Sequence, residues 1–242
     1  MAAILTQVQD YFSEDKVPAR RVRRVRRWAA IAGALIFTVA VAAVAVTRHI
    51  PKEHNGILLT LEFAADANDL RALVPADVRL AVLRAQRDDT WIFVPAYWAV
   101  FSAIGVVLML SGGRINRVSG CLVIGGITIA AVCDWRENAV IAQALRATGQ
   151  PGVSPAGWAA AKWTLLFLVS GALCVPLLTR NRRVRIHANT TAMLFAVAAV
   201  WGVWASFASH GALPGATVLL GGAMFMLALL FIWDSEFFAR PS

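Results

Sequence analysis

The stretch WAAIAGALIFTVAVAAVAVT, residues 28–47, holds twenty uncharged residues between Arg27 and Arg48. A helix rises about 1.5 Å per residue, so this stretch is about 30 Å long and matches the hydrocarbon core of a bilayer. It predicts a membrane-spanning helix. A signal peptide cleaved after Ala43-Val44-Ala45 is the alternative, but the apolar run and its N-terminal flank are both longer than is usual for signal peptides.

Five more weakly charged stretches follow along the chain. They cover residues 90–113, 118–133, 163–179, 188–209 and 213–233. The chain is 59% hydrophobic and 15% charged, whereas soluble domains average about 45–50% and about 25%. We therefore expect an all-α fold, a polytopic transmembrane helical bundle of six spans.

Lys and Arg residues are concentrated in alternate connections between these spans. Fourteen of the 23 fall on one predicted side: Lys16, Arg20, Arg21, Arg23, Arg24, Arg26, Arg27, Arg114, Arg117, Arg180, Arg182, Arg183, Arg185 and Arg240. Cytoplasmic loops carry the excess of basic residues in membrane proteins. We therefore expect a multi-pass protein of the plasma (inner) membrane with both termini cytoplasmic. The net charge of +9 then reports orientation, and no nucleic-acid partner is expected.

The same pattern divides the chain into parts. These are a basic cytoplasmic tail (1–27), a four-helix transmembrane unit (28–179), an extracytoplasmic segment within it (48–89), a basic cytoplasmic linker (180–187), a transmembrane hairpin (188–233) and a cytoplasmic tail (234–242). About forty residues cannot bury a core of their own. The extracytoplasmic segment is therefore expected to fold against the helix ends, with Asn68 or Asp69 capping a turn before Leu70.

The N-terminal tail ends in a dense arginine cluster. Its members are candidate contacts for anionic lipids at the cytoplasmic face: Arg20, Arg21, Arg23, Arg24, Arg26 and Arg27. Each basic residue near such a surface contributes about 1 kcal/mol of attraction. The alternative is that the cluster only holds the first helix in its orientation.

Charged residues within the third and fourth spans form the candidate site. Asp134, Glu137 and Asn138 are three and four residues apart, so they share one face of a helix. Arg136 points elsewhere and can extend toward the membrane surface. The short turn between the spans makes them antiparallel neighbours and brings Lys162 within about one turn of Glu137. Such a cluster is either a structural ion pair or a functional site.

No cofactor is expected from motifs. Haem ligation requires His pairs at matched depth within the bundle, whereas we expect His49, His54 and His210 at the outer surface and His187 at the cytoplasmic one. The glycine pairs Gly125-Gly126 and Gly221-Gly222, together with Gly202, are expected to allow close helix approach rather than phosphate binding. No metal-ligand spacing is present, and a quinone, lipid or pigment held by packing alone would leave no motif.

Three short motifs carry a resemblance to a known family. They are Leu61-Glu62-Phe63-Ala64, the D-x-x-E-N motif from Asp134 to Asn138, and Ala161-Lys162-Trp163. In this order they resemble a family of small bacterial integral membrane proteins with four helices. The similarity covers about residues 56–178, while the basic tail and the helices after residue 187 depart from it. The resemblance implies a paired polar site but names no reaction.

Three functions are compatible with these observations. The first is a non-enzymatic accessory or scaffolding subunit of a membrane complex, with partner subunits in the bilayer. The second is a small-solute or proton transporter that uses Asp134, Glu137 and Lys162. The third is a lipid-modifying enzyme with its site under the 48–89 segment. These observations favour a non-enzymatic role over an enzymatic one.

Overall fold

The computed structural model describes residues 19–54, 56–146, 153–178, 185–208 and 210–233. All regular elements in these ranges are helices, and no strand occurs among them. Six helical stretches are long and apolar enough to cross a membrane: Arg20–Thr47, Arg79–Ser111, Arg114–Leu145, Ala156–Leu178, Ile186–Ala208 and His210–Ile232. The prediction of an all-α polytopic bundle with six spans is therefore confirmed.

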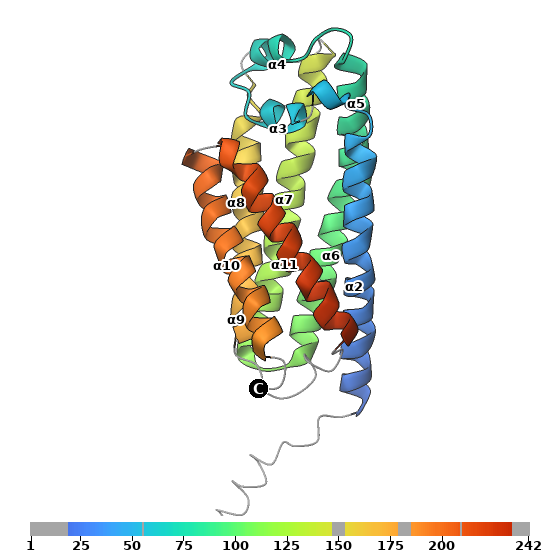
Figure 1. The fold of residues 1–242 in the computed structure, drawn as a ribbon, viewed down its shortest axis with the longest axis vertical. Helices are drawn as coiled ribbons and strands as arrows, with labels where there is room; N and C mark the ends of the chain where they lie inside the picture. Colours follow the sequence, from blue (N-terminus) through green and yellow to red (C-terminus); the bar gives the residue numbers. More distant parts are fainter. Residues whose placement is uncertain (1–18, 55, 147–152, 179–184, 209, 234–242) are drawn as a thin grey trace, which may run out of the picture.

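The spanning helices close into a ring. They are α2 (Ala19–Thr47), α6 (Val94–Ser111), α7 (Arg114–Leu145), α8 (Ala156–Ala172), α10 (Arg185–Ala208) and α11 (Leu213–Trp233). Each packs against the next in this order, and α11 returns to contact α2. Figure 1 shows α11 running obliquely across the bundle, between α10 and the lower part of α2. The short helix α9 (Cys174–Leu178) follows α8 and packs on α10.

One end of the bundle is covered by short helices, and we call it the capped end (Figure 1). The cap contains η1 (Lys52–His54), α3 (Ile57–Glu62) and α4 (Ala67–Leu73). Leu61 and Leu70 are fully buried there against Ile141 of α7. The opposite end, where α2 begins and α6 turns into α7, is called the basic end. The cap can sit on α7 because that helix has 32 residues and is about 48 Å long, more than a bilayer core requires.

The N-terminal cap of helix α4 differs from the sequence prediction. The N-cap of α4 is Asp66, whose carboxylate accepts hydrogen bonds from the backbone N–H groups of Asn68 and Asp69. Asn68 and Asp69 therefore lie inside the first turn instead of capping it. The predicted N-cap lies two to three residues too late, because the backbone of Asp66 is extended and its carboxylate accepts from those free N–H groups.

The second span begins earlier than residue 90. Helix α5 (Arg79–Asp88) continues through a single π-helical turn, η2 (Asp89–Phe93), directly into α6. Pro95 follows this turn in the first turn of α6, and a proline lacks the N–H that a regular helix would use there. The π turn accommodates the missing N–H of Pro95. Such turns often occur at functional sites.

Glycines bring the helices close at only some of the predicted positions. A Cβ on Gly126 would collide with Val169, and one on Gly202 would collide with the ring of Phe167. By contrast, nothing lies within 4 Å of such an atom on Gly125, Gly221 or Gly222. Close approach is thus confirmed at two of the five predicted glycines.

Several predicted segments lie wholly or partly outside the described residues. These are the N-terminal tail up to residue 18, most of the turn between α7 and α8, residues 180–184 of the predicted linker, and the tail from residue 234.

Candidate functional site

A buried charge cluster lies directly beneath the cap. Helix α7 contributes Asp134 and Glu137, α8 contributes Lys162, and α3 of the cap contributes Glu62. Asp134, Glu137 and Lys162 are 3%, 0% and 5% exposed. Arg136 is exposed on the other side of α7, so the predicted separation of the two faces of this helix is confirmed.

Lys162 is the centre of the cluster. Its Nζ lies 2.8 Å from Glu137 Oε2, 3.1 Å from Glu62 Oε2 and 3.3 Å from Asp134 Oδ1. One ammonium on α8 therefore faces three carboxylates, two from α7 and one from α3 of the cap. Taking such charges out of water is costly unless they are paired, so this arrangement ties the cap to the bundle.

Two aromatic side chains complete the contacts of these carboxylates. The Tyr97 hydroxyl donates to Asp134 Oδ2 at 3.0 Å, and the Trp163 indole N–H donates to Glu62 Oε2 at 2.6 Å. The Lys162 ammonium also lies 5.1 Å from the centroid of the Trp163 ring. Both aromatics leave an apolar ring surface next to the charges.

A fourth carboxylate extends the cluster. Asp89, in the π turn, accepts a hydrogen bond from Asn138 Nδ2 at 2.6 Å. Its neighbour Asp88 turns away and pairs with His49 at 2.9 Å, and with Arg87 and Arg48. The two adjacent aspartates therefore serve different contacts.

The cluster contains more carboxyl groups than cations. Glu62, Asp134 and Glu137 pair with the single ammonium of Lys162, and Asp89 adds a fourth carboxyl group through Asn138. Glu137 Oε1 is buried with no hydrogen-bond partner among the described residues. Protons or a bound cation can supply the missing positive charge. Burial raises the pKa of Glu62 above its ordinary value, while the Lys162 ammonium opposes the rise.

A cavity of about 490 Å³ opens at the cluster. Glu62, Asp89, Asp134 and Lys162 form its polar head, and apolar side chains of α2, α6, α8 and α11 form its walls. Phe37 of α2 and Phe225 of α11 line it although they are 47% and 50% exposed. The cavity therefore extends from the buried charges to the outer surface between α2 and α11.

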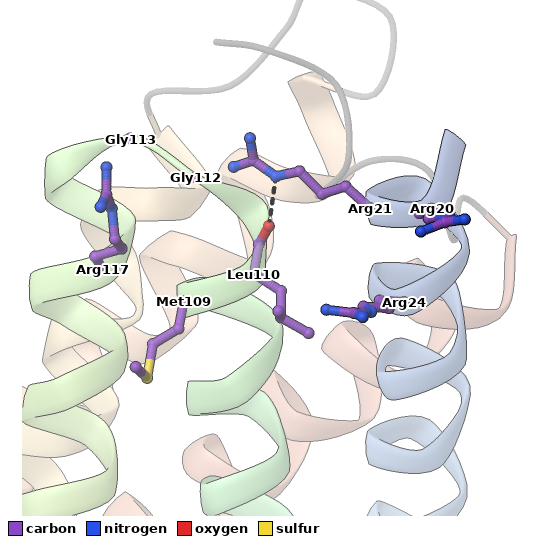
Figure 2. Close-up of a pocket in the computed structure, with 8 residues that line it drawn as sticks. All are labelled: Arg20, Arg21, Arg24, Met109, Leu110, Gly112, Gly113 and Arg117. Atoms are coloured by element: carbon purple, nitrogen blue, oxygen red, sulfur yellow. Dashed lines mark hydrogen bonds between the residues drawn. The ribbon is translucent and has the colours of Figure 1, made fainter. Parts of the chain in front are cut away.

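The predicted arginine contacts lie at the basic end. Arg20, Arg21 and Arg24 line a second pocket with Arg117 of α7, as Figure 2 shows. Arg23, Arg26 and Arg27 are exposed and do not line it.

Sequence reasoning brought together Asp134, Glu137, Asn138 and Lys162 but missed three partners. Asp89 lies directly before the predicted span 90–113, and Tyr97 lies within that span. Glu62 was quoted only as part of a resemblance. The available signal was that Glu62 is flanked by the apolar residues Leu61 and Phe63, which is unusual for a carboxylate on a solvated loop.

No group of His, Cys, Asp and Glu side chains able to hold a metal ion occurs among the described residues. No family model, curated protein or solved structure matches this chain. The family resemblance of the three motifs therefore stays a prediction, and the function is argued from the geometry.

Proposed function

We propose that the protein is a membrane transporter for a small amphipathic cation, which it exchanges for protons at the buried charge cluster. The observation that carries the proposal is that three carboxyl groups, those of Glu62, Asp89 and Asp134, share the head of a cavity with apolar walls with the single ammonium of Lys162, which also pairs with Glu137. A cationic solute would replace protons on these groups. Its apolar part would occupy the space beyond them.

The walls support this solute class. Phe93, Phe101 and Trp163 line the cavity next to the carboxylates. Aromatic faces attract cations by about 0.5–2 kcal/mol when the site is shielded from water. Carboxylates and rings together favour an organic cation over an inorganic one, since an inorganic ion gains nothing from the apolar part of the cavity.

The opening between α2 and α11 supports entry from the bilayer. Apolar residues at the mouth, among them Ala40 and Gly221, are exposed on the surface of spanning helices. An amphipathic solute dissolved in the membrane would reach the cluster without crossing the cap.

Toward the basic end the bundle is closed. Ile104, Leu108, Val123, Ile127 and Phe167 are buried in one continuous core below the cavity. Release on that side would require a second arrangement of the helices, as alternating access does.

The decisive experiment uses the full-length protein in liposomes with an imposed pH gradient. Uptake of tetraphenylphosphonium should follow the gradient and should be lost in Asp134→Asn. The matched control is Asp77→Asn, because Asp77 is an exposed carboxylate of the cap. Gradient-independent uptake, or equal uptake by both variants, would overturn the proposal.

Binding is measured separately by calorimetry in two buffers of different ionisation enthalpy. Exchange predicts that protons are released as the cation binds. Binding with no proton release would show that the site binds the cation but does not exchange it for protons.

We also propose that the basic end faces the cytoplasm of a bacterium and contacts anionic lipids of its plasma membrane. Arg114 and Arg117 lie in the first turn of α7, at the same end of the bundle as the arginines of α2, and the positive-inside rule supports this orientation. A C-terminal fluorescent-protein fusion should fluoresce, since such proteins fold in the cytoplasm. A full-length fusion that does not fluoresce would indicate the opposite orientation.

The accessory-subunit and lipid-enzyme hypotheses remain predictions. The position of Glu62 in the cap, over the cavity, is the observation that favours a lipid substrate. Co-purification of a stoichiometric partner would support the first hypothesis, and turnover of added lipids that is lost in Glu62→Gln would support the second.

A further inference from the structure

A second pocket, of about 690 Å³, lies at the basic end between α2 and the turn from α6 to α7. Its charged lining consists of Arg20, Arg21, Arg24 and Arg117. Met109 and Leu110 form its apolar side (Figure 2). It does not share a lining residue with the cavity at the capped end.

The wall of this pocket is fixed by specific contacts. Arg21 Nε donates to the Leu110 carbonyl at 2.8 Å, and Asn116 Nδ2 donates to the Gly112 carbonyl at 2.7 Å. Gly112 and Gly113 have positive φ angles of 81° and 76°, a region that favours glycine. A Cβ on Gly112 would also collide with the Arg21 guanidinium. The two glycines therefore allow the turn to pack against Arg21.

The positive charge in the pocket has no counter-ion among the residues that the structure describes. None of the ion pairs between described residues involves Arg20, Arg21, Arg24 or Arg117. The acidic residues in the described part of the chain belong to the cap, α5, the π turn and the buried cluster. Four arginines thus line a pocket at the end of the bundle that lacks described carboxylates.

The start of α7 adds to this charge. The helix begins at Arg114, beside Gly113, and no side chain caps its first turn. Free N–H groups and the helix dipole make such a terminus favourable for anions. Guanidinium groups match the geometry of phosphate oxygens through paired hydrogen bonds.

We propose that this pocket is a binding site for a phosphate group, supplied by an anionic lipid headgroup or by free phosphate. The inference rests on the proposed lipid contact of the basic end but restricts it to four arginines around one pocket. It does not depend on transport at the capped end. Met109, which is 40% exposed, would lie beside the first part of a lipid chain.

The test measures binding to the full-length protein in uncharged detergent by thermal shift and native mass spectrometry. The probes are short-chain phosphatidic acid, short-chain phosphatidylglycerol, short-chain phosphatidylcholine and inorganic phosphate. We expect saturable binding of the anionic lipids and weaker binding of phosphatidylcholine. Saturation by inorganic phosphate as well would identify free phosphate as a ligand, and its absence would identify the lipid headgroup. Failure of all the anionic probes to saturate would overturn the site.

The variants separate a built pocket from general attraction. Arg24→Gln/Arg117→Gln should weaken binding of the anionic probes by about tenfold or more, because two charge-assisted contacts are lost. Arg23→Gln/Arg27→Gln removes the same charge from exposed positions outside the pocket and should change affinity less than about threefold. Equal losses would reject the pocket while leaving the proposed lipid contact of the basic end intact. Arg24 and Arg117 are both exposed, so the first pair of changes should not disturb folding.

Discussion

Glu62 and Lys162 meet at 3.1 Å across the boundary between the cap and the membrane-spanning bundle. Glu62 ends α3, whereas Lys162 lies two turns inside α8. The contact joins segments a hundred residues apart, and the Trp163 indole N–H holds the same carboxylate oxygen. Cap and bundle therefore share one electrostatic centre, and changes in the charge of either should be felt by both.

Removal of the ammonium should destabilise the fold. Lys162→Met leaves Glu62, Asp134 and Glu137 facing one another without a cation, and breaking a buried ion pair typically costs about 3–5 kcal/mol. We expect a lower melting temperature in detergent and a lower yield of folded protein. Adding Glu137→Gln to this variant should recover part of the loss. Lys52→Met, at an exposed cap position, is the control and should melt as the wild type does.

Substitution of Glu62 should change how stability depends on pH. Burial raises the folded-state pKa of Glu62 above the ordinary value of 4.5. The stability due to neutral Glu62 is therefore fully present below pH 4.5 and is lost as the pH rises toward the raised pKa. In Glu62→Gln this loss is absent. The melting temperature of the variant should therefore rise relative to that of the wild type as the pH increases. Glu53→Gln, at an exposed position, should keep the wild-type profile; a parallel profile for Glu62→Gln would contradict the prediction.

The contact between α6 and α7 should be sensitive to one methyl group. A Cβ on Gly120 would lie 2.6 Å from the Gly105 carbonyl oxygen and 2.7 Å from Met109 Cγ. Gly120→Ala should therefore destabilise the protein by about 1–3 kcal/mol. Gly125→Ala, on the same helix, meets nothing within 4 Å and should be neutral or stabilising by up to about 1 kcal/mol. Thermal unfolding of the two variants compares them directly, and equal melting temperatures would show that the helices can separate at no cost.

The mouth of the cavity should control solute access. Ala40 lines the cavity at an exposed position of α2, whereas Ala34 is exposed on the same helix but does not line it. Ala40→Trp should obstruct the opening and weaken tetraphenylphosphonium binding by about tenfold or more. Ala34→Trp should bind as the wild type does. Calorimetry measures the affinity of both variants. Unchanged binding in Ala40→Trp would show that the solute does not enter between α2 and α11.

Part of the site follows directly from sequence spacing. Asp134, Glu137 and Asn138 share a face because helical geometry requires it, and the short turn before α8 sets the depth of Lys162. The contribution of Asp89 did not follow, because a π turn before Pro95 changes the direction in which that residue points. Helical periodicity assumes a regular helix and cannot anticipate this change.

Helical periodicity could not predict the position of the cap or the presence of the cavity, for a different reason. The segment 48–89 was expected to fold against the helix ends, but only tertiary packing of Leu61 and Leu70 on Ile141 places Glu62 over Lys162. The cavity depends on the oblique course of α11 past α2 (Figure 1). Apolar composition alone is the same for a helix that packs tightly and for one that leaves a gap.

The closed apolar core between the charge cluster and the arginines has a consequence for the membrane voltage. A proton or cation that reaches Asp134 from the capped end crosses little of the electric field, because that residue lies next to the cap. Passage onward to the basic end crosses most of the field, which amounts to about 2.3 kcal/mol per charge at 100 mV. Occupancy of the cluster from the capped side should thus be nearly independent of voltage, and the step through the core should carry almost all of the electrical work.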